Sequence, residues 1–183
     1  NLAKILAEND KRVLFIDADM RNSVLTKRTG IPDDLKGLSH YLAGKNTASE
    51  VIYATNHKNF YVIPTGRFPK NPTELLNKPA YEVLIEGMKQ TFDYVIIDTP
   101  PLGSVIDSAV IADECDGSII VMESGVISYR FAQDVKQQLE KSNCPILGVV
   151  LNKVDMSRQG YYGKYYGKYY GKYGKYGKYG HED

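Results

Sequence analysis

The chain has 183 residues, of which 43% are hydrophobic and 25% charged, and its formal net charge is +1. This composition is typical of one soluble globular domain with a buried core. No apolar run reaches the roughly 18 residues that a membrane-spanning helix needs. No signal peptide is recognisable at Asn1, so we expect a cytoplasmic protein.

Short apolar runs alternate with helical patterns as far as residue 155. Residues 1–9 resemble the end of a helix, and we expect the strand before it to lie upstream of Asn1. Apolar runs rich in Val and Ile predict five strands buried on both faces, at 13–16, 61–63, 94–97, 118–122 and 146–151. Helix signals lie at 71–74, 81–92 and 132–139. The alternation predicts an α/β fold in which helices cover both faces of a parallel sheet.

The composition changes after residue 157, where Gly-Lys-Tyr units take over. Between Tyr161 and Asp183, five lysines and two acidic residues give a charge of +3, so the rest of the chain carries about −2 by difference. A slightly acidic body argues against a nucleic-acid partner. We expect a folded domain over 1–157 and a disordered, tyrosine-rich tail over 158–183. The tail holds nine tyrosines: Tyr161, Tyr162, Tyr165, Tyr166, Tyr169, Tyr170, Tyr173, Tyr176 and Tyr179.

The first candidate site follows the strand at 13–16, which ends in Asp17, Asp19 and Arg21. In open α/β sheets, ligands bind at the carboxyl ends of the strands. Two carboxylates there can share a Mg²⁺, or one can bind the metal while the other acts as a base. A single Asp at this place would more often cap a turn, so the interpretation depends on the pair and on the nearby Arg.

Two later strand ends carry further candidates. Asp98 follows the apolar run 94–97, the Walker B pattern in which a carboxylate holds Mg²⁺ at a nucleotide, and Pro100 and Pro101 stop a helix from continuing there. We interpret Asp107 as a helix-entry or packing residue. Asn152, at the end of the last strand, can reach the edge of a base or simply form a turn. The two cysteines, Cys115 and Cys144, fit no metal or redox spacing, and we expect them to be reduced and partly buried.

Together these motifs resemble the bacterial tyrosine kinases (BY-kinases), which belong to the MinD/ParA-like branch of P-loop proteins. Residues 17–21 are similar to the family's Walker A′ motif, 95–101 to its Walker B, and 71–76 to the segment between them. Residues 147–153 are similar to its last strand, and the tail to its tyrosine cluster. The sequence departs from the family in two respects. GxxxxGK[ST], the Walker A loop that cradles the phosphates, occurs nowhere in it, and the family's arginine-bearing interface helix, which lies further upstream, is missing too. We therefore expect an N-terminal truncation that leaves this chain inactive alone.

The resemblance implies a P-loop fold and an ATP- and Mg²⁺-dependent autokinase that regulates capsular or exopolysaccharide synthesis and export. It assigns Mg²⁺ to Asp17 and Asp98, the role of base to Asp19, and nucleotide contacts to Arg21 and Asn152. The nine tail tyrosines would be phosphorylated between subunits of a ring-like homo-oligomer. A membrane-spanning activator would hold the kinase at the inner face of the membrane, and a tyrosine phosphatase would reverse the reaction.

Three alternatives remain open on the sequence alone. A GTPase would explain residues 152–155, which match Asn-Lys-x-Asp, but Pro101 stands where such proteins place a Gly that donates to the γ-phosphate. A binding module would use the Lys/Tyr tail to stack the bases of single-stranded nucleic acid. A MinD/ParA-like ATPase would carry the tail as a low-complexity extension.

Overall fold

A computed structural model describes residues 1–23, 25, 35–101, 107–142 and 144–154. Its strands are β1 (Val13–Asp17), β2 (Tyr53–Ala54), β3 (Phe60–Ile63), β4 (Tyr94–Asp98), β5 (Ser118–Glu123) and β6 (Ile146–Asn152). Its helices are α1 (Leu2–Glu8), α3 (Leu38–Leu42), η1 (Ala48–Glu50), α4 (Pro72–Leu76), α5 (Pro79–Thr91), α6 (Asp107–Ala112) and α7 (Tyr129–Leu139). The predicted α/β class is confirmed, and the five expected strands lie within one residue of their predicted bounds.

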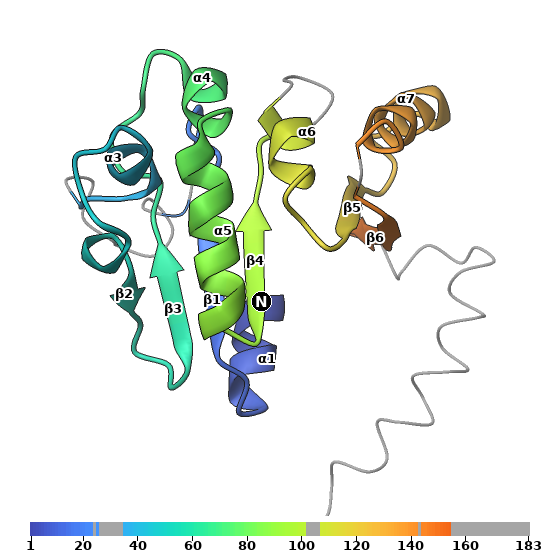
Figure 1. Cartoon of the computed structure of the whole chain (residues 1–183). Coiled ribbons are helices and arrows are strands. Elements are labelled where there is room, and N and C mark those ends of the chain that lie inside the picture. Colours follow the sequence, from blue (N-terminus) through green and yellow to red (C-terminus); the bar gives the residue numbers. More distant parts are fainter. Residues whose placement is uncertain (24, 26–34, 102–106, 143, 155–183) are drawn as a thin grey trace, which may run out of the picture.

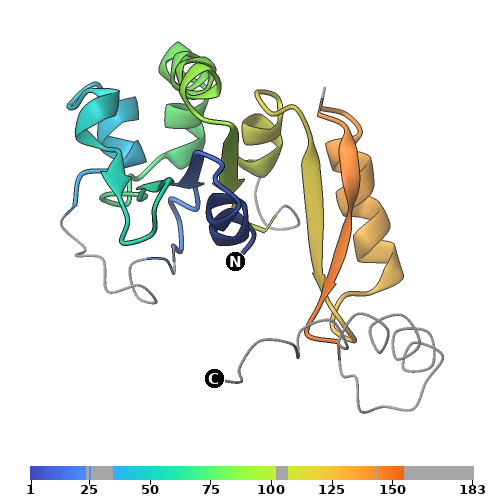
Figure 2. The ribbon, with the colours of Figure 1, turned by 90° about the horizontal axis from the view of Figure 1, so that it is seen from below.

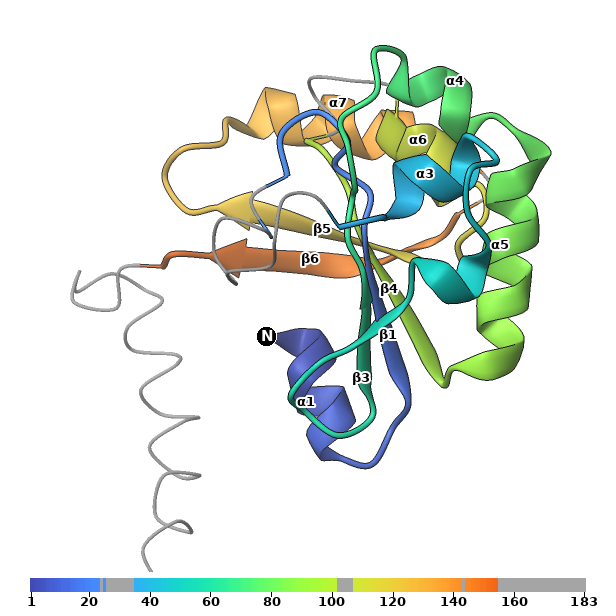
Figure 3. The ribbon, with the colours of Figure 1, turned by 90° about the vertical axis from the view of Figure 1, so that its left-hand side faces the viewer.

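The strands form two sheets in the part of the chain that the structure describes, where the sequence predicted one. The first sheet has the order β2-β3-β1-β4, and the second pairs β5 with β6 in parallel. β1 runs parallel to β3 and β4, whereas the short β2 pairs antiparallel with β3. β2 was missed because a two-residue strand contains no apolar run. In Figure 3 the second sheet crosses the strand direction of the first.

Alternating side chains of β1 divide the first sheet's core into two layers. Leu14 and Ile16 are fully buried in the larger cluster, to which α3, α4, α5 and α6 contribute. Val13 is buried with two alanines of α1 on the other face. Figures 1 and 2 show this arrangement, with α5 along one face of the sheet and α1 on the opposite face. Each such Leu or Ile stabilises the fold by about 1.5–3 kcal/mol.

The second sheet is packed less completely, which corrects the prediction that every strand is buried on both faces. α7 covers one side of it through Val135 and Leu139, which pack with Ile120. However, Val121 and Leu147 are 63% and 69% exposed. Their apolar character identified strands correctly but not how deeply those strands would be buried.

The helix signal at 71–92 corresponds to two helices rather than one continuous segment. α4 has Pro72 in its first turn, as predicted, and ends at Leu76, while Pro79 begins α5. The side chain of Asn71 donates to Glu74 at 3.1 Å, and no side-chain capping bond is made at the start of α4. Both cysteines are free, as expected, with Cys144 buried and Cys115 half-buried. No helix among the described residues is both long and apolar enough to cross a bilayer.

Candidate active site

The predicted acidic residues meet at the carboxyl ends of β1 and β4. Asp17 and Asp98 are register partners in these two parallel strands. The next residue of the first loop, Ala18, donates its backbone N–H to the carbonyl of Asp98 at 2.8 Å. Pairing of the two strands therefore brings together residues that lie 81 positions apart in the sequence.

Asp17 is the buried member of this group, with 1% of its surface exposed. Its carboxylate accepts hydrogen bonds from the hydroxyl of Ser23 and from the backbone N–H of Asp19. Burial raises the pKa of Asp17; the hydrogen bonds from Ser23 and Asp19 oppose this shift, and the negative charge of Asp19 adds to it. A cation at this strand end would therefore relieve an electrostatic cost.

Asp19 organises the loop that follows β1. Its Oδ1 accepts the backbone N–H groups of Arg21 at 3.2 Å and Asn22 at 2.9 Å, a turn typical of Asp. Among the described residues, no donor contacts its Oδ2. The half-buried carboxylate thus keeps one oxygen available for a ligand or a proton.

Asp98 lies at the exposed end of β4. Its pKa is raised, first by loss of hydration and then by the charges of Asp17 and Asp19. Oxygen ligands of this kind suit Mg²⁺, which usually takes one or two protein carboxylates and completes its shell with water and phosphate oxygens. In the described part of the chain no three His, Cys, Asp or Glu residues are grouped as a metal cage, and a Mg²⁺ site shared with phosphates does not require one.

The guanidinium of Arg21 does not contact these three carboxylates but pairs with another buried acid, Asp107. Its Nε donates to Asp107 Oδ2 at 2.7 Å, and Nη2 donates to Asp107 Oδ1 at 3.2 Å and to Thr73 Oγ1 at 3.1 Å. Asp107 begins α6 and is 1% exposed, so its interpretation as a helix-entry and packing residue is confirmed. Nothing in the sequence indicates that Thr73 joins this group, because it stands inside a helix-start pattern that already accounts for it.

The remaining predicted site residues lie elsewhere. Asn152 ends β6 in the second sheet, and its Oδ1 accepts the backbone N–H of Lys153 at 2.9 Å. Lys153 has a φ of 54°, in the left-handed region, which fits the turn that was the alternative interpretation of Asn152. Asp155 and the nine tail tyrosines lie outside the described residues, as does the predicted disorder of the tail.

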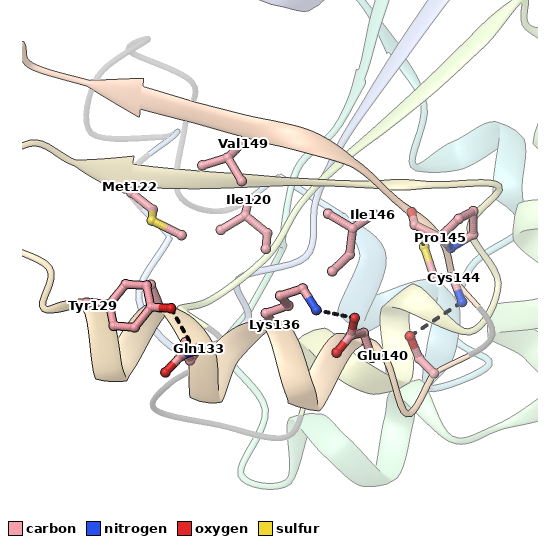
Figure 4. Close-up of a pocket in the computed structure, with 12 residues that line it drawn as sticks. Ile120, Met122, Tyr129, Gln133, Lys136, Glu140, Cys144, Pro145, Ile146 and Val149 are labelled. Carbon is pink, nitrogen blue, oxygen red and sulfur yellow. Dashed lines mark hydrogen bonds and ion pairs between the residues drawn. The ribbon is translucent and has the colours of Figure 1, made fainter.

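A hollow of about 830 Å³ opens between α7 and the β5–β6 sheet (Figure 4). Tyr129 and Lys136 line it from α7, and Glu140, just after the helix, pairs with Lys136. Met122 and Ile146 line it from the sheet. None of its lining residues is a predicted site residue. The predicted acidic residues therefore lie at the first sheet and not at this hollow.

Comparisons with known proteins identify the family to which this chain belongs. A family model described as an AAA domain matches residues 1–143. The chain is 41% identical over 169 residues to the tyrosine-protein kinase CpsD of Streptococcus agalactiae, covering 90% of this chain and 74% of CpsD. The solved kinase domain of the Escherichia coli tyrosine kinase ETK superposes with a TM-score of 0.81 at 35% identity, covering 87% of this chain and 63% of that one. MinD of Pyrococcus horikoshii, solved with Mg-ADP, gives 0.71 at 25% identity, covering 86% and 64%.

The fold and the strand-end carboxylates thus define a P-loop protein of the MinD/ParA-like class, a class that binds nucleotide and Mg²⁺. Within that class, the chain belongs to the bacterial tyrosine-protein kinases, the BY-kinases. The resemblance stated from the sequence is confirmed.

Proposed function

We propose that this chain supplies the catalytic carboxylates of an ATP-dependent kinase that phosphorylates its own C-terminal tyrosines. The observation that carries the proposal is the meeting of Asp17, Asp19 and Asp98 at adjoining strand ends, in a member of the tyrosine-protein kinase family. Residues 1–157 would form the kinase domain, and 158–183 would be the substrate tail.

Asp17 and Asp98 would hold Mg²⁺, which when bound neutralises charge on the β- and γ-phosphate oxygens. Loss of hydration and then repulsion from Asp17 and Asp19 raise the pKa of Asp98, and a metal ion would offset the repulsion. Asn152 at the edge of the base and Arg21 at the nucleotide stay predictions, because Arg21 is paired with Asp107 and Asn152 with the backbone of Lys153.

Asp19 would act as the base. The phenolic oxygen of a tyrosine forms a bond to the γ-phosphorus, the bond from that phosphorus to the bridging oxygen breaks, and ADP leaves. The tyrosine proton passes to Oδ2 of Asp19, the oxygen that is not engaged by Arg21 and Asn22. A base of this kind contributes about 10²–10⁴-fold to the rate, so binding and charge neutralisation must supply most of the rest.

The tail would be phosphorylated between subunits. A coil of 23 residues has a typical end-to-end distance of roughly 26 Å, so a tail of the length of 161–183 would be long enough to enter a neighbouring copy. Nine phosphotyrosines would change the tail's charge from +3 to roughly −10 to −15. Repulsion between such tails would convert a ring-like homo-oligomer into smaller species.

In the cell, we expect a membrane-spanning activator to hold the kinase at the inner face of the membrane, and a tyrosine phosphatase to reset the tail. The process controlled would be capsular or exopolysaccharide synthesis and export. These partners follow from membership of the family and are tested by co-purification with tagged kinase.

The decisive experiment separates the roles of the acids. It uses residues 1–183 preceded by upstream residues that supply a Walker A loop, called the loop-bearing chain below. Asp98→Asn should weaken ATP binding at limiting Mg²⁺, whereas Asp19→Asn should reduce tyrosine phosphorylation by about 10²–10⁴-fold with little change in ATP affinity. Glu123→Gln, at the end of β5, is the matched control and should change neither quantity. Full kinase activity in both Asp variants would show that the site is wrongly assigned.

Transfer between subunits has its own test. An Asp19→Asn chain with an intact tail should become phosphorylated by an active partner whose tail is deleted, and light scattering should then report smaller species. An Asp19→Asn chain that stays unlabelled beside the active partner would contradict transfer between subunits. ATPase turnover without phosphotyrosine would favour a MinD-like ATPase, and preference for GTP over ATP would favour the GTPase.

A further inference from the structure

Helix α6 is tied to the loop that follows Asp98. Ser108, the second residue of α6, is 3% exposed, and its hydroxyl donates to the carbonyl of Pro100 at 2.5 Å. Pro100 follows Asp98 by two residues. The start of α6 therefore fixes the backbone of the loop that leaves the proposed metal site.

The preceding residue ties the same helix to the other loop. Asp107 accepts two hydrogen bonds from the guanidinium of Arg21, and the backbone N–H of Arg21 donates to Asp19 Oδ1. Thr73, in the first turn of α4, donates its hydroxyl to Asp107 at 2.5 Å and accepts from Arg21. These four residues, Arg21, Thr73, Asp107 and Ser108, are called the α6 junction below.

The electrostatics of the α6 junction favour a fixed arrangement. Burial alone would raise the pKa of Asp107, but hydrogen bonds from Arg21 and Thr73 and the positive charge of Arg21 lower it below its ordinary value. The Asp107 side chain is only 2% exposed, so separating it from Arg21 would leave a buried negative charge without an opposite charge beside it. The planar guanidinium meets the carboxylate with two donors, which fixes direction as well as distance.

We propose that Thr73, Asp107 and Ser108 are positioning residues for tyrosine phosphorylation. Through Arg21 and Pro100 they hold the loop that bears Asp19 and the loop that follows Asp98 in one geometry. The inference rests on the proposed roles of Asp19 and Asp98. None of the three residues touches the reacting atoms, so their loss should slow phosphoryl transfer without weakening the binding of nucleotide.

The first test measures the single-turnover rate of tyrosine phosphorylation in the loop-bearing chain at saturating Mg-ATP, together with the Kd for ATP. Because small displacements of catalytic groups can cost up to about 10²-fold, we expect Asp107→Asn to approach that loss and Thr73→Val to lose about tenfold. The Kd for ATP should stay within about threefold of the original. Thr73→Ser restores the hydroxyl and should restore the rate, and Ser108→Ala should slow transfer through the other loop.

A second readout needs no nucleotide. In the 183-residue chain, the backbone N–H groups of Arg21 and Asn22 donate to Asp19, so their hydrogens should exchange slowly. Asp107→Asn should speed their exchange more than it speeds exchange in the centre of β1, whereas a general loss of stability would affect both. The matched control is Asp93→Asn at the opposite end of the same strands, where Asp93 accepts the N–H of Arg12 at 2.7 Å. This control should leave the rate of transfer and these two amides unchanged.

The outcomes separate this inference from the proposed function. Suppose that Thr73→Val and Asp107→Asn leave the rate of tyrosine phosphorylation unchanged while Asp19→Asn is inactive. This result would overturn the positioning role of the α6 junction and leave the proposed site intact. A rise in the Kd for ATP at an unchanged maximal rate would also overturn it, because the α6 junction would then serve binding. If Asp107→Asn does not fold, the comparison of Thr73→Val with Thr73→Ser tests the positioning role.

Discussion

In both sheets, paired strands end in polar residues that face each other, but the charged groups around these residues differ. In the first, Asp17 faces Asp98 in register; in the second, Glu123 faces Asn152. Asp17 and Asp98 lie beside Asp19. The pKa of Asp17 is raised by burial and by the charge of Asp19, and that of the more exposed Asp98 by loss of hydration and by the charges of Asp17 and Asp19. Glu123 instead pairs with Lys153 at 2.8 Å, with both side chains well exposed. A polar residue at a strand end therefore indicates chemistry only where packing concentrates charge that a ligand could neutralise.

The largest expected difference concerns packing. Ile16→Ala in β1 should lower the free energy of unfolding by about 2–5 kcal/mol, because Ile16 is fully buried. The same change at Ile119 in β5, which is 48% exposed, should cost under about 1 kcal/mol. Urea unfolding of the two variants measures both values. Equal losses would show that the second sheet is as tightly packed as the first.

The second largest difference concerns nucleotide binding, which should depend on the strand ends of the first sheet and not on those of the second. A ligand at 100 times its Kd stabilises a protein by about 2.7 kcal/mol, so Mg-ATP should raise the Tm of the loop-bearing chain. Residues 1–183 alone contain no Walker A loop and should show no shift. Asp98→Asn should reduce the shift in the loop-bearing chain, and Glu123→Gln should not. A clear shift for residues 1–183 alone would contradict the expectation that the loop is required.

The third prediction uses pH. A carboxyl group whose pKa is raised on folding stabilises the fold below its ordinary value of about 3.9, and this contribution is lost as pH rises through the raised value. The double variant that carries both Asp17→Asn and Asp98→Asn should therefore have a higher Tm at pH 7 without nucleotide. The rise should be about 2–4 °C for each kcal/mol of destabilisation that the two changes remove. The advantage should shrink as pH falls toward about 4. An advantage that grows on acidification would contradict the raised pKa values.

The smallest effect is expected at the second strand end. A double-mutant cycle on Glu123 and Lys153 should give a coupling free energy of roughly 0.2–1 kcal/mol, falling with added salt, as for other exposed pairs. The cycle on Asp107 and Arg21 should give a larger value, because the Asp107 side chain is 2% exposed. Equal coupling free energies for the two pairs would contradict the electrostatic difference between the two sheets.

Much of the fold was predictable because strands and helices leave local patterns. The apolar runs located β1, β3, β4, β5 and β6, and Pro72 marked the start of α4. The pair Asp17 and Asp19 and the Asp98 pattern indicated the acidic site for the same reason, since each stands at or just beyond the end of a strand. The α6 junction was not predictable. Thr73 and Ser108 are ordinary residues at helix starts, and their role depends on partners 34 and 8 positions away.

The sequence by itself determined the α/β class, the acidic strand ends and the family, because these depend on local periodicity and on short motifs. Only the tertiary structure decided that Asp17 and Asp98 are register partners and that Arg21 binds Asp107. It also decided that β5 and β6 keep exposed apolar side chains, although their composition matches that of a buried strand. The physical reason is that the burial of a side chain and its electrostatic pairing depend on which residues folding brings next to it. The local sequence around a residue does not specify those neighbours.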